Sequence, residues 1–193
     1  VPLRLEPYGS VFVVFHNAGD AVTTRDETRV VEASREITGP WKVCFPPGWG
    51  APATKTLDRL PSWTDVVDEG IRYFSGVATY RSTFDLTGEE LAAKLLAIDL
   101  GRVRFVAEVF VNGRNVGTVW KPPFRVDITN AARSGRNELV VEVANTWSNR
   151  LAGDARTEGR DYCRTNIAKS LTWQLPWKDT PLLESGLLGP VRL

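Results

Sequence analysis

Short segments in which apolar and polar residues alternate recur along this chain, and each is bounded by glycine, proline, asparagine or aspartate. In Ala78–Phe84 every second residue suits a packed face and the others suit solvent, as in a half-buried strand. Arg104–Val111 alternates in the same way and leads directly into Asn112-Gly113, the strongest short signal for a β-hairpin. Helical periodicity is nearly absent, because the one stretch of good helix formers, Gly88–Ala93, is long enough only for a turn or two. The sequence therefore predicts an all-β sandwich or barrel.

The alternating segments place most of the expected strands in the second half of the chain. We expect strands at 10–15, 28–34, 41–45, 78–84, 94–100, 104–111, 115–120, 124–128, 138–145 and 186–193. Residues 48–76 and 146–180 lack this periodicity, and we expect long loops there, with Ser62 capping a short helical turn in the first of them. Long loops on a rigid sandwich commonly carry binding residues, so a site is expected in these two stretches.

Size and charge restrict the classes of function. A chain of 193 residues suits one domain with a sizeable core. Its 24 Lys and Arg residues balance 23 Asp and Glu residues, so the net charge of +1 provides no field to recruit nucleic acid or an anionic membrane. No run approaches the ~18 apolar residues of a membrane helix, and we expect a soluble protein.

The start of the chain contains no methionine and no signal-like pattern, which indicates a processed piece whose export signal lies outside it. We expect residues 1–25 to be an arm from a preceding domain and residues 26–193 to form the sandwich.

Cys44 and Cys163 are the only cysteines, and their wide separation fits neither a zinc knuckle nor a redox pair. The alternation around Cys44 places it on the face opposite Trp41 and Val43, where a covering loop that contains Cys163 can reach it. A single disulfide and two free thiols both remain open.

Five segments in this order resemble the sugar-binding domain of family 2 glycoside hydrolases. They are 73–84, 96–101, 107–117, 123–129 and 135–145. The opening segment Tyr8–Phe15 and the closing segment Ser185–Leu193 resemble the C-terminal region of the α-L-rhamnosidases of glycoside hydrolase family 106.

The resemblance implies a galactose-binding-like jelly-roll β-sandwich that serves as an accessory domain of a secreted or periplasmic glycoside hydrolase, of α-L-rhamnosidase type. It also implies that the hydrolytic carboxylates belong to a separate catalytic domain of the parent enzyme. That catalytic domain and carbohydrate are the expected partners, and no catalytic residue is expected in this chain.

The residues themselves give no catalytic or metal-binding pattern. Glycoside hydrolysis needs two carboxylates about 5 to 9.5 Å apart across a cleft, and no pair can be placed so from sequence. His16, the only histidine, lies beside Asn17 in the expected arm, where a solvated side chain is expected rather than a general base. We expect no cofactor. Asp154 or Asp161 can contribute to a structural calcium, but no spacing specifies such a site.

Sugar binding is the sharper functional hypothesis for the loops. Aromatic rings stack on the apolar face of a pyranose, and Arg and Asp share its hydroxyls in hydrogen bonds. The candidates are Trp49, Trp63, Trp147, Arg150, Arg156, Arg160, Asp161, Trp173 and Trp177. The alternative for each tryptophan is that it covers the end of the sandwich or packs against the next domain. An accessory docking domain, an independent carbohydrate-binding module and a self-sufficient enzyme are the three classes considered, the last being the least favoured.

Overall fold

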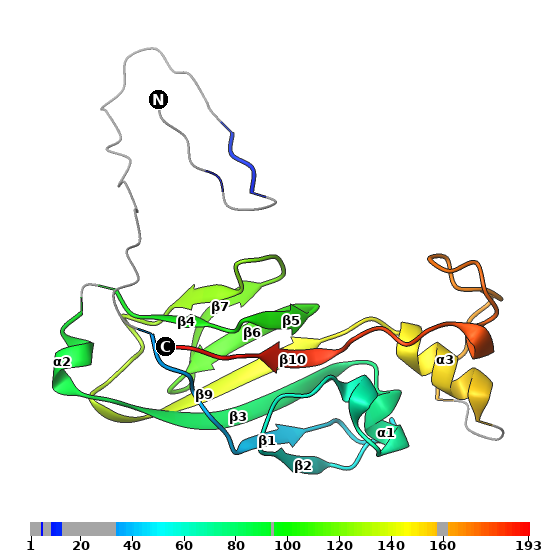
Figure 1. Ribbon diagram of the computed structural model, residues 1–193, viewed down its shortest axis with the longest axis horizontal. Coiled ribbons are helices and arrows are strands. Elements are labelled where there is room, and N and C mark those ends of the chain that lie inside the picture. Colours follow the sequence, from blue (N-terminus) through cyan, green and yellow to red (C-terminus); the bar gives the residue numbers. More distant parts are fainter. Residues whose placement is uncertain (1–4, 6–8, 13–33, 94, 158–161) are drawn as a thin grey trace.

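The computed structural model describes residues 5, 9–12, 34–93, 95–157 and 162–193, and it shows strands in two layers with short helices at the ends (Figure 1). The elements are β1 (Trp41–Cys44), β2 (Thr54–Leu57), η1 (Trp63–Asp65), α1 (Glu69–Arg72), β3 (Val77–Leu86), α2 (Gly88–Leu91), β4 (Ala97–Asp99), β5 (Arg102–Arg104), β6 (Val106–Val111), β7 (Arg114–Val119), β8 (Arg125–Asp127), β9 (Gly135–Ala144), α3 (Ser148–Arg156), η2 (Trp177–Asp179) and β10 (Gly186–Gly189). The predicted all-β sandwich is confirmed.

The first layer is a six-stranded antiparallel sheet in the order β2-β1-β3-β9-β6-β7. β3 and β9 are its longest strands and pair along their whole length, with Val77 opposite Ala144 and Leu86 opposite Gly135. Alternation along this ladder buries one face of the sheet and exposes the other.

The second layer is made of two strand pairs, β10 with β5 and β4 with β8. Arg192, which follows β10, joins the two pairs because it forms an antiparallel bridge to Asp99 in β4. It also forms an antiparallel bridge to Glu36. Gly101 lies so close to the chain after β10 that a Cβ there would be 2.5 Å from the carbonyl carbon of Gly189, so only glycine fits at position 101.

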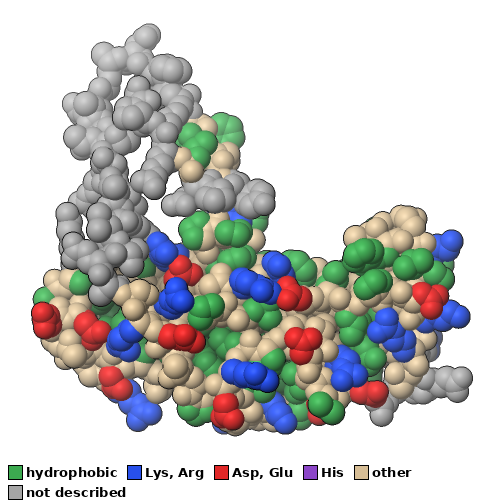
Figure 2. Space-filling view, in the orientation of Figure 1, with side chains coloured by type: hydrophobic (Ala, Val, Ile, Leu, Met, Phe, Trp, Pro, Cys, Tyr) green, Lys and Arg blue, Asp and Glu red, His purple; other side chains and the backbone are tan. Residues whose placement is uncertain are grey.

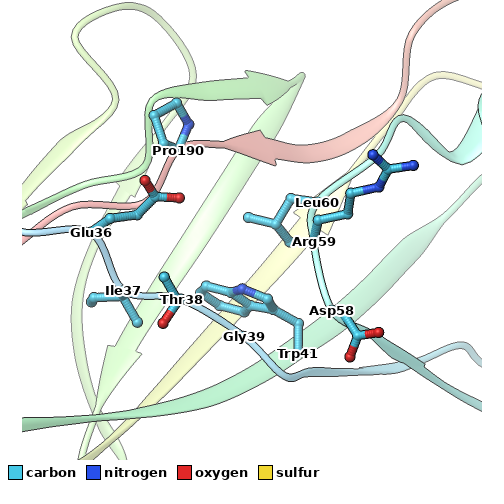
Figure 3. A pocket seen from close by; sticks show the side chains of 9 residues that line it. All are labelled: Glu36, Ile37, Thr38, Gly39, Trp41, Asp58, Arg59, Leu60 and Pro190. Carbon is cyan, nitrogen blue, oxygen red and sulfur yellow. The ribbon is translucent and has the colours of Figure 1, made fainter.

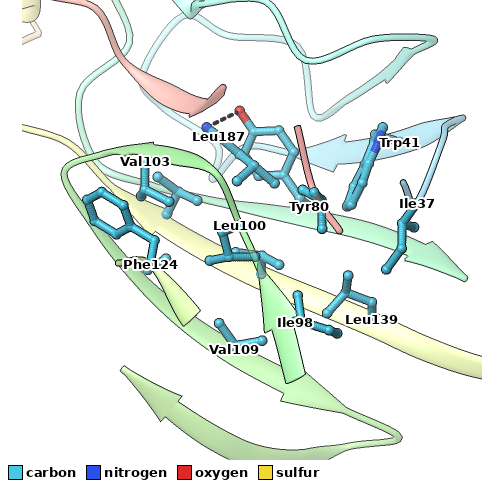
Figure 4. Packing of buried hydrophobic residues seen from close by; sticks show 14 of the residues in the cluster. Ile37, Trp41, Tyr80, Ile98, Leu100, Val103, Val109, Phe124, Leu139 and Leu187 are labelled. Atoms are coloured by element: carbon cyan, nitrogen blue, oxygen red, sulfur yellow. Dashed lines mark hydrogen bonds between the residues drawn. The ribbon is translucent and has the colours of Figure 1, made fainter. Parts of the chain in front are cut away.

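The core lies between these layers (Figure 4). Side chains that meet there include Tyr80, Val109 and Leu139 from the first layer and Ile98, Leu100, Val103 and Leu187 from the second. The hydroxyl of Tyr80 accepts hydrogen bonds from the indole Nε1 of Trp63 at 2.5 Å and from the amide of Leu187 at 3.2 Å. Burial raises the pKa of Tyr80 far above its ordinary value, so this phenol stays neutral and acts as the acceptor for both donors.

The two asparagine corners form as the sequence predicted. Asn112 (φ 52°) and Gly113 (φ 78°) turn β6 into β7 with both residues at positive φ. Asn137 donates hydrogen bonds of 2.8 Å to the carbonyls of Arg133 and Gly135, within its own turn. The amide of Asn112 also donates to the side-chain oxygen of Asn137 at 2.8 Å, so the two corners support each other.

The two stretches expected to be long loops contain regular structure. Residues 48–76 contain β2, which pairs with β1 of the preceding segment, and Ser62 caps η1 as expected. Residues 146–180, expected to be irregular, contain the nine-residue helix α3. The prediction was wrong for α3 because its buried face includes Asn149, Arg150 and Gly153, so no apolar periodicity marks the helix.

The N-terminal expectations are mostly untested. The described residues Gly9–Phe12 are not in a strand, and the rest of the expected strand 10–15 lies outside the described residues. Most of the expected strand 28–34 and the boundary between residues 25 and 26 also lie outside them.

Cys44 and Cys163 are not joined by a disulfide in the structure. Cys44 Sγ lies 3.9 Å from Thr54 Oγ1, and the thiol of Cys163 donates to Asp154 Oδ2 at 3.5 Å. Across the part of the chain that the structure describes, no helix has the length and apolar content needed to span a membrane.

Candidate functional surface at the α3 end of the sandwich

The loops that carry the sequence-predicted site residues gather at one end of the sandwich, around α1 and α3 (Figure 1). η1 packs on α1, and η2 packs on α3. Helix α3 holds three neighbouring segments in place: the chain that leads into β10, the segment that begins at Tyr162, and η2.

The start of α3 is held by side chains and segments distant in sequence. The N-cap residue Trp147 provides no side-chain cap, and the hydroxyl of Ser75 accepts from the amide of Arg150 at 3.1 Å in its place. Asn149 binds the backbone of Leu183 from both sides, since its amide group donates to the carbonyl at 2.7 Å and its oxygen accepts from the amide at 2.8 Å. The helix is thereby fixed to the chain that leads into β10.

A buried ion pair lies one turn further along α3. Arg150 Nε is 2.8 Å from Asp154 Oδ1, and the two side chains are only 4% and 6% exposed. The two atoms do not meet the angular criterion of a hydrogen bond, so the attraction between these side chains is that of an ion pair. The guanidinium of Arg150 also lies over the rings of Tyr162, 4.6 Å from the centroid, and Tyr73, at 5.9 Å.

The second oxygen of Asp154 holds the beginning of the next described segment. Asp154 Oδ2 accepts from the amides of Tyr162 at 3.1 Å and Cys163 at 3.0 Å. Oδ2 is thus occupied by protein donors, whereas Oδ1 faces the guanidinium of Arg150 without a hydrogen bond, so the charge of this carboxylate is already paired with a buried cation. Asp161, the other calcium candidate, lies outside the described residues. Among the described residues there is no group of three or more His, Cys, Asp or Glu side chains that could hold a metal ion.

The end of α3 holds the far end of the same segment. Arg156 donates to the carbonyls of Lys178 at 2.9 Å and Thr180 at 2.5 Å, which fixes η2 against the helix. Residues 164–176 therefore project between two points that α3 holds, Asp154 at one side and Arg156 at the other.

The projecting segment is a hairpin with an apolar surface, which we call the apolar hairpin (residues 165–176). A bridge pairs Lys169 with Pro176, and Ser170 donates to the carbonyl of Leu175 at 2.9 Å and accepts from Gln174 at 2.8 Å. Its exposed apolar side chains are Ile167 (40%), Leu171 (74%), Trp173 (44%) and Leu175 (40%). Figure 2 shows hydrophobic side chains around this projection at the upper right.

The structure separates the predicted tryptophans by exposure. Trp63 is completely buried, so its ring offers no face to a ligand and serves the core instead. Trp49 is half-buried against the core and Trp177 is half-buried with its indole donating to the carbonyl of Ile167 at 2.7 Å. Trp147 (74% exposed) and Trp173 present open rings.

The predicted polar partners are engaged inside the protein or lie outside the described residues. Arg150 and Arg156 bind Asp154 and backbone carbonyls, as described above. Arg160 and Asp161 lie outside the described residues. Sequence reasoning missed Ile167, Leu171 and Leu175, although large apolar residues in a stretch without periodicity were an available signal.

Two surface hollows lie elsewhere and contain none of the predicted site residues. The first, of about 100 Å³, lies at the edge between the layers and is lined by Glu36, Ile37, Thr38, Gly39, Trp41, Asp58, Arg59, Leu60 and Pro190 (Figure 3). It is smaller than the several hundred Å³ typical of ligand pockets. The second, of about 320 Å³, is an open hollow beside β3 and β9 that includes the Arg81–Glu138 ion pair.

Residues 68–179 match the family described as "Glycosyl hydrolase 2 galactose-binding domain-like". The match covers more than half of the chain, and this chain belongs to that family of galactose-binding-like domains of glycoside hydrolases. Helix α3 and the apolar hairpin lie within the matched residues.

Individual relatives point to large glycoside hydrolases. The chain is 41% identical to a rhamnosidase from Novosphingobium sp. PP1Y, with a TM-score of 0.73 over 89% of this chain and 16% of that one. It is 39% identical over 176 residues to a protein of Formosa agariphila named "Putative beta-glucuronidase", which covers 81% of this chain and 15% of that protein. A β-glucuronidase from Ruminococcus gnavus shares the fold over 58% of this chain and 21% of its own, with 25% identity and a TM-score of 0.51. The chain thus spans about a sixth of the first two relatives.

Proposed function

We propose that this chain is a non-catalytic accessory domain of a larger glycoside hydrolase of the α-L-rhamnosidase type, which packs against the catalytic part of that enzyme and positions it. The observation that carries the proposal is the match to the Novosphingobium rhamnosidase, which extends over 89% of this chain at 41% identity but over only 16% of the rhamnosidase. A domain-sized likeness within a much larger hydrolase is what an accessory domain produces.

The use of the acidic residues near α1 and α3 supports a structural role for this end of the sandwich. Asp68 caps α1 by accepting from the amide of Ile71 at 3.2 Å. Asp154 is buried in its ion pair with Arg150. A hydrolytic carboxylate has to reach the glycosidic oxygen or the anomeric carbon of a sugar, and these two side chains are directed at protein groups instead.

The test compares the 193-residue chain with the full-length parent enzyme on p-nitrophenyl α-L-rhamnopyranoside and p-nitrophenyl β-D-glucuronide. We expect hydrolysis of the rhamnoside by the parent and none by the isolated chain at equal molar concentration. Turnover by the isolated chain contradicts the non-catalytic role, and a parent that cleaves only the glucuronide contradicts the rhamnosidase assignment.

A second candidate is an independent carbohydrate-binding module, which the open ring of Trp147 favours. It predicts heat of binding in calorimetry of the isolated chain with rhamnose-containing oligosaccharides, lost in Trp147→Ala. Trp120→Ala is the matched control, because Trp120 is comparably exposed (68% against 74%) and belongs to the β7–β8 connection instead. Absence of binding at millimolar sugar excludes this candidate and leaves the docking role.

We also propose a secreted or periplasmic location, because a hydrolase of this family meets its polysaccharide substrate outside the cytoplasm. The measurement is cell fractionation of the parent enzyme in its native host.

A further inference from the structure

We propose that the apolar hairpin (residues 165–176) is the element by which this domain docks onto the remaining part of its parent polypeptide. The proposal rests on the accessory function proposed above and names the surface that carries it out. It identifies the partner as a groove that is apolar at its centre and acidic at its rim.

The first argument is the apolar surface itself. Four large apolar side chains are exposed on one short hairpin, and Leu171 at 74% and Trp173 at 44% lie at its tip. Contiguous exposed apolar groups of this kind mark interaction surfaces, and tryptophan is enriched where such surfaces bind a protein partner.

The second argument is that hydrogen bonds within the hairpin hold the conformation of its tip. The hydroxyl of Ser170 accepts from the amide of Trp173 at 3.4 Å, and the side-chain amide of Gln174 donates to the carbonyl of Leu171 at 2.8 Å. A hairpin whose turn is already held by internal hydrogen bonds loses little conformational entropy on docking to a protein partner.

The third argument is the position of the hairpin on the domain. Asp154 and Arg156 hold the two sides of the projecting segment to α3, and α3 itself is held to Leu183 before β10. A force or displacement at the hairpin is thus transmitted to the sandwich through one helix, which suits an element that fixes the orientation of a whole domain.

The fourth argument concerns charge and the choice of occupant. The apolar hairpin contains Lys169 and no Asp or Glu. Two copies of this chain that met through the hairpin about a two-fold axis would bring the two Lys169 side chains together, which opposes self-association. The two large relatives extend this domain by about five times its length, so a neighbouring domain of the same polypeptide is present in stoichiometric amount and at high effective concentration.

The test follows amide hydrogen exchange of the peptide 165–176 in the isolated 193-residue chain and in the full-length parent enzyme. Docking predicts that exchange in this peptide slows by at least about tenfold in the parent, because the hairpin can then open only after undocking. Equal exchange rates in the two proteins overturn the proposal.

The double variant Leu171→Ser/Trp173→Ser gives the second readout. In the parent we expect a lower thermal midpoint, by several degrees, and loss of the exchange protection. In the isolated chain we expect the midpoint to change by no more than about 1 °C, because both side chains lie outside the core. Trp120→Ser is the matched control and leaves protection of the hairpin unchanged. A variant that destabilises both proteins equally shows that the hairpin serves only the fold of its own domain, and it overturns the proposal.

Two further assays on the isolated chain address the other occupants. Concentration-dependent dimerisation that Trp173→Ser abolishes, or binding to vesicles of phosphatidylcholine and phosphatidylserine that the same variant abolishes, assigns the hairpin to a second copy or to a membrane and overturns the proposal. The accessory function fails separately, if the isolated chain hydrolyses glycosides, and that result leaves the exchange comparison interpretable.

Discussion

Replacing Asp154 with asparagine tests the ion pair that joins α3 to the segment before the apolar hairpin. The substitution keeps the shape of the side chain and one oxygen to accept from the amides of Tyr162 and Cys163, but it removes the negative charge 2.8 Å from Arg150 Nε. Both side chains of the pair are more than nine-tenths buried, so the arginine charge stays in a poorly solvated site without its partner.

The magnitude follows from this burial. Removal of one member of a buried ion pair costs about 3–5 kcal/mol. Arg150 keeps the carbonyl of Trp49 at 3.4 Å and the ring of Tyr162, and a cation–π contact of this kind is worth about 0.5–2 kcal/mol, so we expect Asp154→Asn to lower the free energy of unfolding by about 3 kcal/mol.

Urea unfolding of the isolated chain, followed by tryptophan fluorescence, measures this loss. Glu138→Gln is the matched control, because the Arg81–Glu138 pair is 3.2 Å long but about half exposed, and its loss costs at most about 1 kcal/mol. The variant Arg150→Met/Asp154→Asn should lose less than the sum of the two single changes, since both members of the pair are then neutral. If Asp154→Asn costs no more than Glu138→Gln, the buried pair does not stabilise this end of the sandwich and the reasoning fails.

Two further predictions concern the core and the capping of α2. Tyr80→Phe leaves the indole of Trp63 and the amide of Leu187 buried without an acceptor, so urea unfolding should show a loss of about 3 kcal/mol. Glu90 accepts from the amide of Thr87 and lies beside a cation, and these interactions lower the pKa of its carboxyl below the ordinary value. The capping box therefore contributes fully above the ordinary pKa of Glu, about 4.3, and is lost as the pH falls through the lower folded value, which a carbon-detected NMR titration of Glu90 will show.

Controls make both of these predictions specific. Tyr73→Phe removes a half-buried hydroxyl that carries no hydrogen bond within the described residues, and it should cost less than about 0.5 kcal/mol. Equal losses for Tyr73→Phe and Tyr80→Phe refute the account of the buried phenol. Glu90→Gln should abolish the pH response of α2, and a titration midpoint at or above the ordinary value refutes the capping argument.

Strands that expose one face to solvent could be predicted from the sequence, because the alternation of apolar and polar residues is visible without knowledge of the partner strand. Ala78–Phe84 became part of β3, and Asn112-Gly113 became the turn between β6 and β7. The corner formed by Asn137 was also predictable, since its hydrogen bonds are made within its own turn. The side-chain pattern and the hydrogen bonds within a few residues determine these elements.

Helix α3 and the roles of the tryptophans could not be predicted in this way. Asn149 and Arg150 are buried in contact with Leu183, Ser75 and Asp154, and all but the last of these partners are distant in sequence. Trp63 and Trp173 both stand in stretches without periodicity, yet one is fully buried and the other is 44% exposed. Which of them packs into the core depends on contacts made only after the sheets have assembled.

The strand that completes the second layer has a consequence for synthesis of the protein. β10 pairs with β5, and Arg192 bridges Asp99, so these partners leave the ribosome about 80 residues before the strand that covers them. Until then β5 has no partner strand, and the core lacks the apolar side chains of Leu187 and Val191. Nascent chains that pause before residue 186 should therefore recruit chaperones that recognise exposed apolar segments, and release from those chaperones should coincide with the appearance of β10.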